Sequence, residues 1–104
     1  MANNWNIPSQ LEKEVRERDK KCVYCGAEFT PAKISRRTCA SWEHIINDAK
    51  IITQENICLC CCSCNASKGQ KQLSQWLQSK YCIERGINKD SVAPIIQKAI
   101  ERGL

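Results

Sequence analysis

Two cysteine pairs, each separated by two residues, constrain the fold of this 104-residue chain more than any other feature. The first pair is Cys22 and Cys25, and the second is Cys61 and Cys64. A gap of two residues lets both thiolates of a pair bind one ion at about 2.3 Å, and two such pairs complete a closed tetrahedral site. The pattern therefore predicts a structural Zn²⁺ ion held by these four cysteines.

The 35 residues between the two pairs exceed the spacing of a simple zinc ribbon, so we expect a folded insert between them. The second pair has an alternative register, because Cys58 and Cys61 have the same spacing. The cysteines outside the predicted site are expected to be small buried hydrophobic residues, since free cysteine behaves in this way. They are Cys39, Cys58, Cys60, Cys62 and Cys82.

Nine cysteines in a chain of this length indicate either a disulfide framework or metal and redox chemistry. The N-terminal residues lack the basic and apolar stretches of a secretory signal, and no apolar run approaches the roughly 20 residues of a membrane span. We therefore expect a cytoplasmic metalloprotein with no membrane partner. A thioredoxin-like redox pair is the alternative, but the sequence does not show the strand–helix–strand pattern in which such a pair occurs.

The formal net charge of +5 permits a nucleic-acid partner without requiring one. The surplus of basic residues is spread along the chain and is largest over residues 51–80, which also hold most of the cysteines. Four thiolates around one dication carry a net charge of −2, which would bring the working charge nearer to +3. Charge alone therefore identifies no partner.

The hydrophobic pattern and the capping residues predict an α+β domain spanning residues 1–104. Ser9 and Glu12 form a predicted capping box at the start of a helix that reaches about residue 21. Strands are expected at 38–47 and 56–60 with a turn at 47–50, and helices at 62–68, at 73–86 and from Asp90 or Ser91 to about 103. Apolar residues at helical spacing after residue 72 are expected to form core.

His44 is the one histidine of the chain, and its neighbours favour a chemical role. Glu43 precedes it in a predicted strand, where adjacent side chains point to opposite faces. A carboxylate, a carboxamide oxygen from Asn65 and water would suit Mg²⁺ or Mn²⁺ rather than Zn²⁺. A neutral imidazole can take a proton from water while such an ion holds a phosphate. Lys68 and the N-terminus of the helix that carries Asn65 would add positive potential for that phosphate.

These residues together resemble a known family. The order Glu43-His44-Ile-Ile, Glu55-Asn56-Ile and Cys61-x-x-Cys64-Asn65-x-x-Lys68-Gly69 is similar to the HNH endonucleases, the ββα-metal nucleases, in their zinc-bearing form. The resemblance covers residues 22–69, and it implies a ββα-metal core stapled by the zinc ion, with flanking helices at about 9–21 and 73–103.

By position, the resemblance implies that Glu43 and Asn65 bind a catalytic Mg²⁺ or Mn²⁺ ion and that His44 is the general base. Asn56 would hold the imidazole in its orientation. The implied reaction is hydrolysis of phosphodiester bonds in DNA, leaving a 5′-phosphate and a 3′-hydroxyl.

A monomer with one such site would nick double-stranded DNA, and a homodimer would be needed to cut both strands. The side chains expected to contact the DNA backbone are Arg36, Arg37, Lys68 and Lys71. The alternative hypothesis is a non-catalytic zinc-stabilised module that binds DNA or protein. Such a module needs the four cysteines but has no need of the chemistry at His44.

Overall fold

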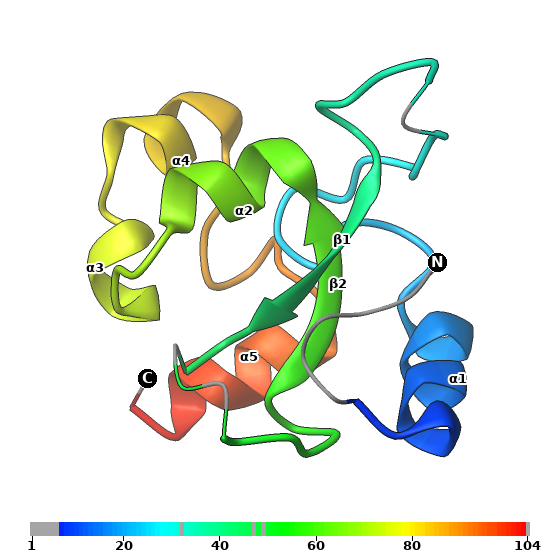
Figure 1. The fold of residues 1–104 in the computed structure, drawn as a ribbon. Helices are drawn as coiled ribbons and strands as arrows, with labels where there is room; N and C mark the ends of the chain where they lie inside the picture. The colour runs from blue at the N-terminus through cyan, green and yellow to red at the C-terminus, as the bar shows by residue number, and fades with distance from the viewer. Residues whose placement is uncertain (1–6, 32, 47, 49, 104) are drawn as a thin grey trace.

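A two-stranded antiparallel hairpin with helices packed around it organises the chain, as the α+β prediction required (Figure 1). The computed structural model describes residues 7–31, 33–46, 48 and 50–103. Its elements are α1 (Ser9–Arg18), β1 (Ala40–His44), β2 (Ile57–Cys61), α2 (Cys62–Lys68), α3 (Leu73–Trp76), α4 (Lys80–Arg85) and α5 (Pro94–Glu101). No helix among these residues is long and apolar enough to cross a membrane.

Successive side chains of the hairpin point to its two opposite faces. The register runs from the Ala40–Cys61 pair to the His44–Ile57 pair, and every residue of β2 is buried. Ile57 and Leu59 pack with α1 in one apolar cluster, whereas Cys58 and Cys60 belong to a second cluster on the other side. Because β2 is covered on both faces, it reads in the sequence as an apolar run without alternation.

The larger cluster holds the residues that the sequence predicted as core after residue 72. Leu73 and Trp76 are fully buried, and the Trp76 ring meets the edge of Tyr24 at a centroid distance of 4.8 Å. Ile96 and Ala99 of α5 are also fully buried in this cluster. The predicted apolar stripes are therefore confirmed as core.

Helix α1 differs from its prediction at both ends. Pro8 is the N-cap residue and Ser9 the first helical residue, so the predicted capping box is wrong. The helix ends at Arg18 because Asp19 turns inward, where its carboxylate accepts a hydrogen bond from the backbone N–H of Leu59 at 3.1 Å.

The helix predicted over residues 73–86 is in fact two short helices, α3 and α4. Ser79 interrupts it, since its hydroxyl accepts a hydrogen bond from the backbone N–H of Cys82 at 3.3 Å and caps α4. Gly86 ends α4 in the left-handed conformation, with φ 67°. A serine inside an apolar helical pattern can compete with the helix in this way.

Helix α5 begins at Pro94, later than predicted. Asn88 holds the preceding residues in a turn, because its side-chain oxygen accepts hydrogen bonds from the backbone N–H groups of Asp90 and Ser91 at 2.9 and 3.1 Å. Proline suits the first turn of a helix, because a backbone N–H at that position would have no carbonyl partner within the helix. The predicted position of Pro94 is confirmed, and the predicted start at Asp90 or Ser91 is wrong.

β1 is shorter than predicted and β2 is shifted by one residue, but α2 has the predicted bounds. β1 spans five residues of the predicted 38–47, and β2 starts one residue later than predicted, at Ile57. Asn47 and Ala49, which belong to the predicted turn, lie outside the described residues. α2 ends at Lys68, and Gly69 follows it with a φ of 51°, a backbone conformation that residues other than glycine rarely adopt.

Candidate metal centre and the end of strand β1

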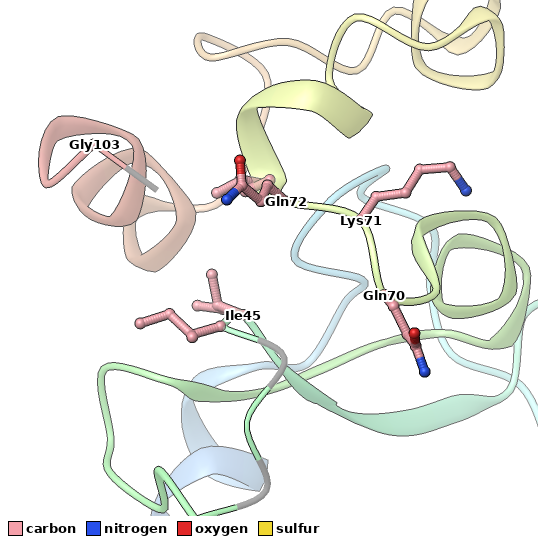
Figure 2. Close-up of a pocket in the computed structure, with 7 residues that line it drawn as sticks. Ile45, Gln70, Lys71, Gln72 and Gly103 are labelled. Atoms are coloured by element: carbon pink, nitrogen blue, oxygen red, sulfur yellow. The ribbon is translucent and has the colours of Figure 1, made fainter.

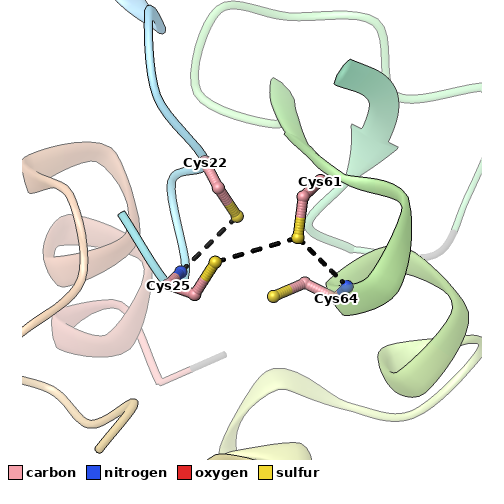
Figure 3. A group of neighbouring side chains, drawn as sticks. All are labelled: Cys22, Cys25, Cys61 and Cys64. Carbon is pink, nitrogen blue, oxygen red and sulfur yellow. Dashed lines mark hydrogen bonds between the residues drawn. The ribbon is translucent and has the colours of Figure 1, made fainter. Parts of the chain in front are cut away.

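The four cysteines of the two predicted pairs come together in space (Figure 3). The Sγ atoms of Cys22, Cys25, Cys61 and Cys64 all lie within 4.8 Å of one another. Cys58 lies in the apolar core and not in this group, which decides the register of the second pair. Among the described residues, these four cysteines form a site that could hold zinc.

The geometry of both pairs fits a tetrahedral ion. The backbone N–H of Cys25 donates to Cys22 Sγ at 3.5 Å, and that of Cys64 donates to Cys61 Sγ at 3.4 Å. Cys25 Sγ and Cys61 Sγ are 3.8 Å apart, which is about the 3.8 Å edge of a tetrahedron with four 2.3 Å zinc–sulfur bonds. The donor set and its spacing therefore match structural Zn²⁺, which would tie the loop at 22–25 to the junction of β2 and α2.

The thiols of this cluster share negative charge unequally. Hydrogen bonds from Cys61 and Cys64 lower the pKa of Cys22 to about 2. The same contact with Cys22 raises the pKa of Cys61 to about 12 and raises that of Cys64 further. Zinc takes all four cysteines as thiolates, so binding would release protons and would weaken as the pH falls.

A basic cleft of about 480 Å³ lies beside the cysteine cluster, and both Cys25 and Cys61 line it. Arg37, predicted to contact DNA, lines this cleft together with Arg85, which the sequence analysis missed. The Arg85 guanidinium lies over the ring of Tyr81 at 3.8 Å, which fixes its position. No local pattern joins residues 37 and 85, so the fold was needed to find this pair of cations.

Glu43 faces the core side of β1 and is paired with a buried lysine. Its Oε2 accepts a hydrogen bond from the Tyr24 hydroxyl at 2.9 Å and lies 3.4 Å from Lys68 Nζ. Lys68 Nζ also donates to the backbone carbonyl of Ile45 at 3.1 Å. Lys68 has no exposed surface, so its predicted contact with a DNA phosphate is wrong in this arrangement.

The residues predicted to bind a catalytic ion do not fit one as they are arranged. The ammonium group of Lys68 already balances the charge of the Glu43 carboxylate. The Asn65 amide nitrogen donates to Ser41 Oγ at 3.0 Å and to the Trp42 carbonyl at 3.1 Å. Burial raises the pKa of Glu43, while Lys68 and Tyr24 act against that rise.

His44 ends β1 and, by strand alternation, lies on the face opposite Glu43. The residue is 6% exposed, and its Nε2 atom is buried. Burial lowers the pKa of His44, and the nearby charge of Asp48 acts in the opposite direction. The imidazole is therefore neutral at neutral pH, but little of it is open to a substrate.

Asn56 fixes the segment that follows His44. Its Oδ1 accepts a hydrogen bond from the backbone N–H of Ile46 at 2.7 Å, and its Nδ2 donates to the carbonyls of Ile46 at 3.2 Å and Ile51 at 3.1 Å. These bonds close the loop between β1 and β2. Asn56 thus holds the backbone beside His44, and its predicted action on the imidazole itself stays a prediction.

The remaining predicted DNA contacts lie at the surface. Arg36, Arg37 and Lys71 are all exposed. Lys71 lines a cavity of about 190 Å³ between the end of β1, the segment after α2 and the C-terminal residues (Figure 2). The cavity is lined by Ile45, Ile46, Gln70, Lys71, Gln72, Leu73 and Gly103.

No protein-family model matches this chain, and neither the curated proteins nor the solved structures include a significant match. The zinc site and the α+β fold therefore rest on the geometry of the chain itself.

The burial of His44 predicts a pH-dependent contribution to stability. Because the folded-state pKa lies below the ordinary value of 6.5, the unfolded chain binds more protons just below that pH. The contribution of neutral His44 is complete above pH 6.5 and is lost as the pH falls toward the lowered pKa. Urea unfolding from about pH 7 to about pH 5 should show wild type losing stability relative to His44→Gln. Parallel curves for the two proteins would contradict this expectation.

Proposed function

We propose that this domain hydrolyses phosphodiester bonds in DNA, with His44 as the general base. The observation that carries the proposal is the hairpin–helix unit that the four cysteines close. Within this unit Glu43 and His44 end β1, and Asn65 of α2 is hydrogen-bonded to β1. The same residues, in the same order, give the sequence its resemblance to the HNH endonucleases.

The proposed chemistry uses the neutral imidazole. His44 accepts a proton from water as the water oxygen bonds to phosphorus, and the bond from phosphorus to the 3′ oxygen breaks. The departing 3′ oxygen takes a proton from a second water, and His44 returns its proton to solvent. The products are a 5′-phosphate and a 3′-hydroxyl. Because His44 is 6% exposed, DNA can reach it only if neighbouring residues move.

A catalytic Mg²⁺ or Mn²⁺ ion remains part of this proposal, with a specific requirement. When bound, such an ion would stabilise the negative charge that develops on the phosphate. To hold such an ion, Glu43 would have to give up its pairing with the ammonium group of Lys68, which lies 3.4 Å from the carboxylate. Half-maximal activity should therefore require a higher concentration of the added ion than a carboxylate without this partner would need.

Backbone contacts with DNA would come from the exposed arginines and Lys71. Arg37 and Arg85 line one cleft, which gives two cations for neighbouring phosphates. With one site per chain, a monomer would nick double-stranded DNA, and a homodimer would cut both strands.

Nicking of supercoiled plasmid tests the proposal. Zinc-loaded protein should produce relaxed circles with added Mg²⁺ or Mn²⁺ and none after dialysis without them. His44→Ala should lower the rate by at least about 100-fold, the scale of a lost general base. Lys89→Ala, an exposed change prepared in the same way, should leave the rate unchanged. Cleavage that survives in a folded, zinc-loaded His44→Ala protein would refute the assignment.

A non-catalytic zinc module that binds DNA is the second candidate, and two observations favour it. Lys68 neutralises Glu43 from within the core, and His44 is almost wholly covered. This module would bind duplex DNA without nicking it under any divalent ion. Arg37→Ala with Arg85→Ala should then weaken binding and flatten its salt dependence, whereas His44→Ala should not.

A further inference from the structure

Two cysteines outside the four-cysteine cluster face each other across the start of the hairpin. Cys39 Sγ and Cys62 Sγ are 2.6 Å apart, and both are free thiols. Cys39 directly precedes β1, and Cys62 is the first residue of α2. The sequence analysis expected both to be buried, but both are partly exposed, whereas Cys58, Cys60 and Cys82 are buried as expected.

The backbone already holds this pair in a geometry that a disulfide requires. The N–H of Cys62 donates to the carbonyl of Cys39 at 3.0 Å, which extends the pairing of Ala40 with Cys61 by one step. Opposed residues of an antiparallel pair have Cα atoms about 4.5–5.5 Å apart, within the range that disulfides span. Rotation of the side chains is then sufficient for bonding, without movement of the chain.

We propose that Cys39 and Cys62 are a redox modification site and form a reversible disulfide on exposure to peroxide. One thiolate displaces water from hydrogen peroxide and becomes a sulfenic acid, and the other thiol attacks that sulfur and releases a second water. Both sulfurs are oxidised and the peroxide is reduced. A small thiol reverses the reaction by exchange, which returns two thiols.

The position of this pair outside the group of possible zinc ligands separates it from the four-cysteine cluster. In that cluster, zinc would engage all four thiolates, whereas Cys39 and Cys62 lie outside it. The new bond would also act on the predicted DNA surface. Cys39 Sγ donates to the carbonyl of Arg36 at 3.2 Å, and the N–H of Ser63 donates to the carbonyl of Arg37 at 3.1 Å. A disulfide would break the first contact and fasten this segment to α2.

The test is mass spectrometry of zinc-loaded protein after brief treatment with hydrogen peroxide. The intact mass should fall by two hydrogens, and a peptide map made without reduction should join the peptides that contain Cys39 and Cys62. Zinc content should be unchanged, and dithiothreitol should restore the mass. A bond among Cys22, Cys25, Cys61 and Cys64 with loss of zinc, or no bond at all, would overturn the proposal.

Matched variants complete the experiment. Cys39→Ser and Cys62→Ser should each abolish the loss of two hydrogens, whereas Cys82→Ser, at a buried site, should leave it intact. Zinc content measured on each variant confirms that it is folded. Loss of two hydrogens in a zinc-loaded Cys39→Ser protein would show that another pair reacts.

Discussion

Removing zinc from the four-cysteine cluster is expected to unfold the domain. The cluster joins the loop at 22–25 to the end of β2, and that loop places Val23 and Tyr24 in the core. Binding of structural zinc contributes about 10–16 kcal/mol in small domains, as large as the roughly 5–15 kcal/mol by which whole domains are stable. Losing a contribution of that size leaves no margin of stability, so the chain is expected to unfold.

Circular dichroism and metal analysis measure this effect. We expect one zinc per chain, loss of helical signal with a strong chelator, and recovery when zinc is added back. Cys22→Ser should reproduce the loss, and Cys39→Ser, outside the cluster, should not. A chelated protein that keeps its helical signal and a cooperative melting transition would contradict the prediction. A zinc-free protein as isolated, with Cys61 joined to Cys64, would favour the redox alternative.

The parts of the fold set by local patterns could be predicted from the sequence. Two-residue spacing identifies Cys22 with Cys25 and Cys61 with Cys64, because the spacing itself produces a metal-binding turn. The apolar run of β2 followed at once by α2 is also local. Spacing alone favours the Cys61–Cys64 pair no more than the Cys58–Cys61 pair, since both have two intervening residues.

Contacts between elements that pack face to face, such as α2 against β1, could not be predicted from the sequence. Lys68 lies one helical turn after Asn65, and the sequence read it as a surface cation near a phosphate. The fold instead turns that face of α2 onto β1, where the Glu43 carboxylate and the Ile45 carbonyl receive the ammonium group. Nothing near Tyr24 in the chain indicates that its hydroxyl bonds to a residue 19 positions away.

Pairings between distant residues account for the other misses. The contact of Cys39 with Cys62 follows from strand register, and the shared cleft of Arg37 and Arg85 follows from the packing of α4. Helix breaks were also missed, because Ser79 sits within an apolar repeat that favours one longer helix. The spacing of apolar residues predicts which side chains are buried better than it predicts where a helix ends.

Replacing Lys68 by Met is expected to cost about 3–5 kcal/mol of unfolding free energy, the range measured when one partner of a buried ion pair is removed. Lys68 has no exposed surface and Glu43 is 6% exposed, so the variant leaves a carboxylate in the core without its cation. The Ile45 carbonyl also loses its hydrogen bond from Lys68 Nζ. Urea unfolding of zinc-loaded protein measures the loss.

The double variant Glu43→Gln with Lys68→Met should recover much of this loss, since it removes the buried charge with its partner. The same variants test the catalytic ion. If Glu43 can bind Mn²⁺ once the ammonium group is gone, Mn²⁺ should stabilise Lys68→Met more than wild type and should leave the double variant unchanged. Equal responses of all three proteins would show that Glu43 binds no ion even when Lys68 is absent. A loss below about 1 kcal/mol in Lys68→Met would mean that water reaches the carboxylate, and that the pair behaves as an exposed one.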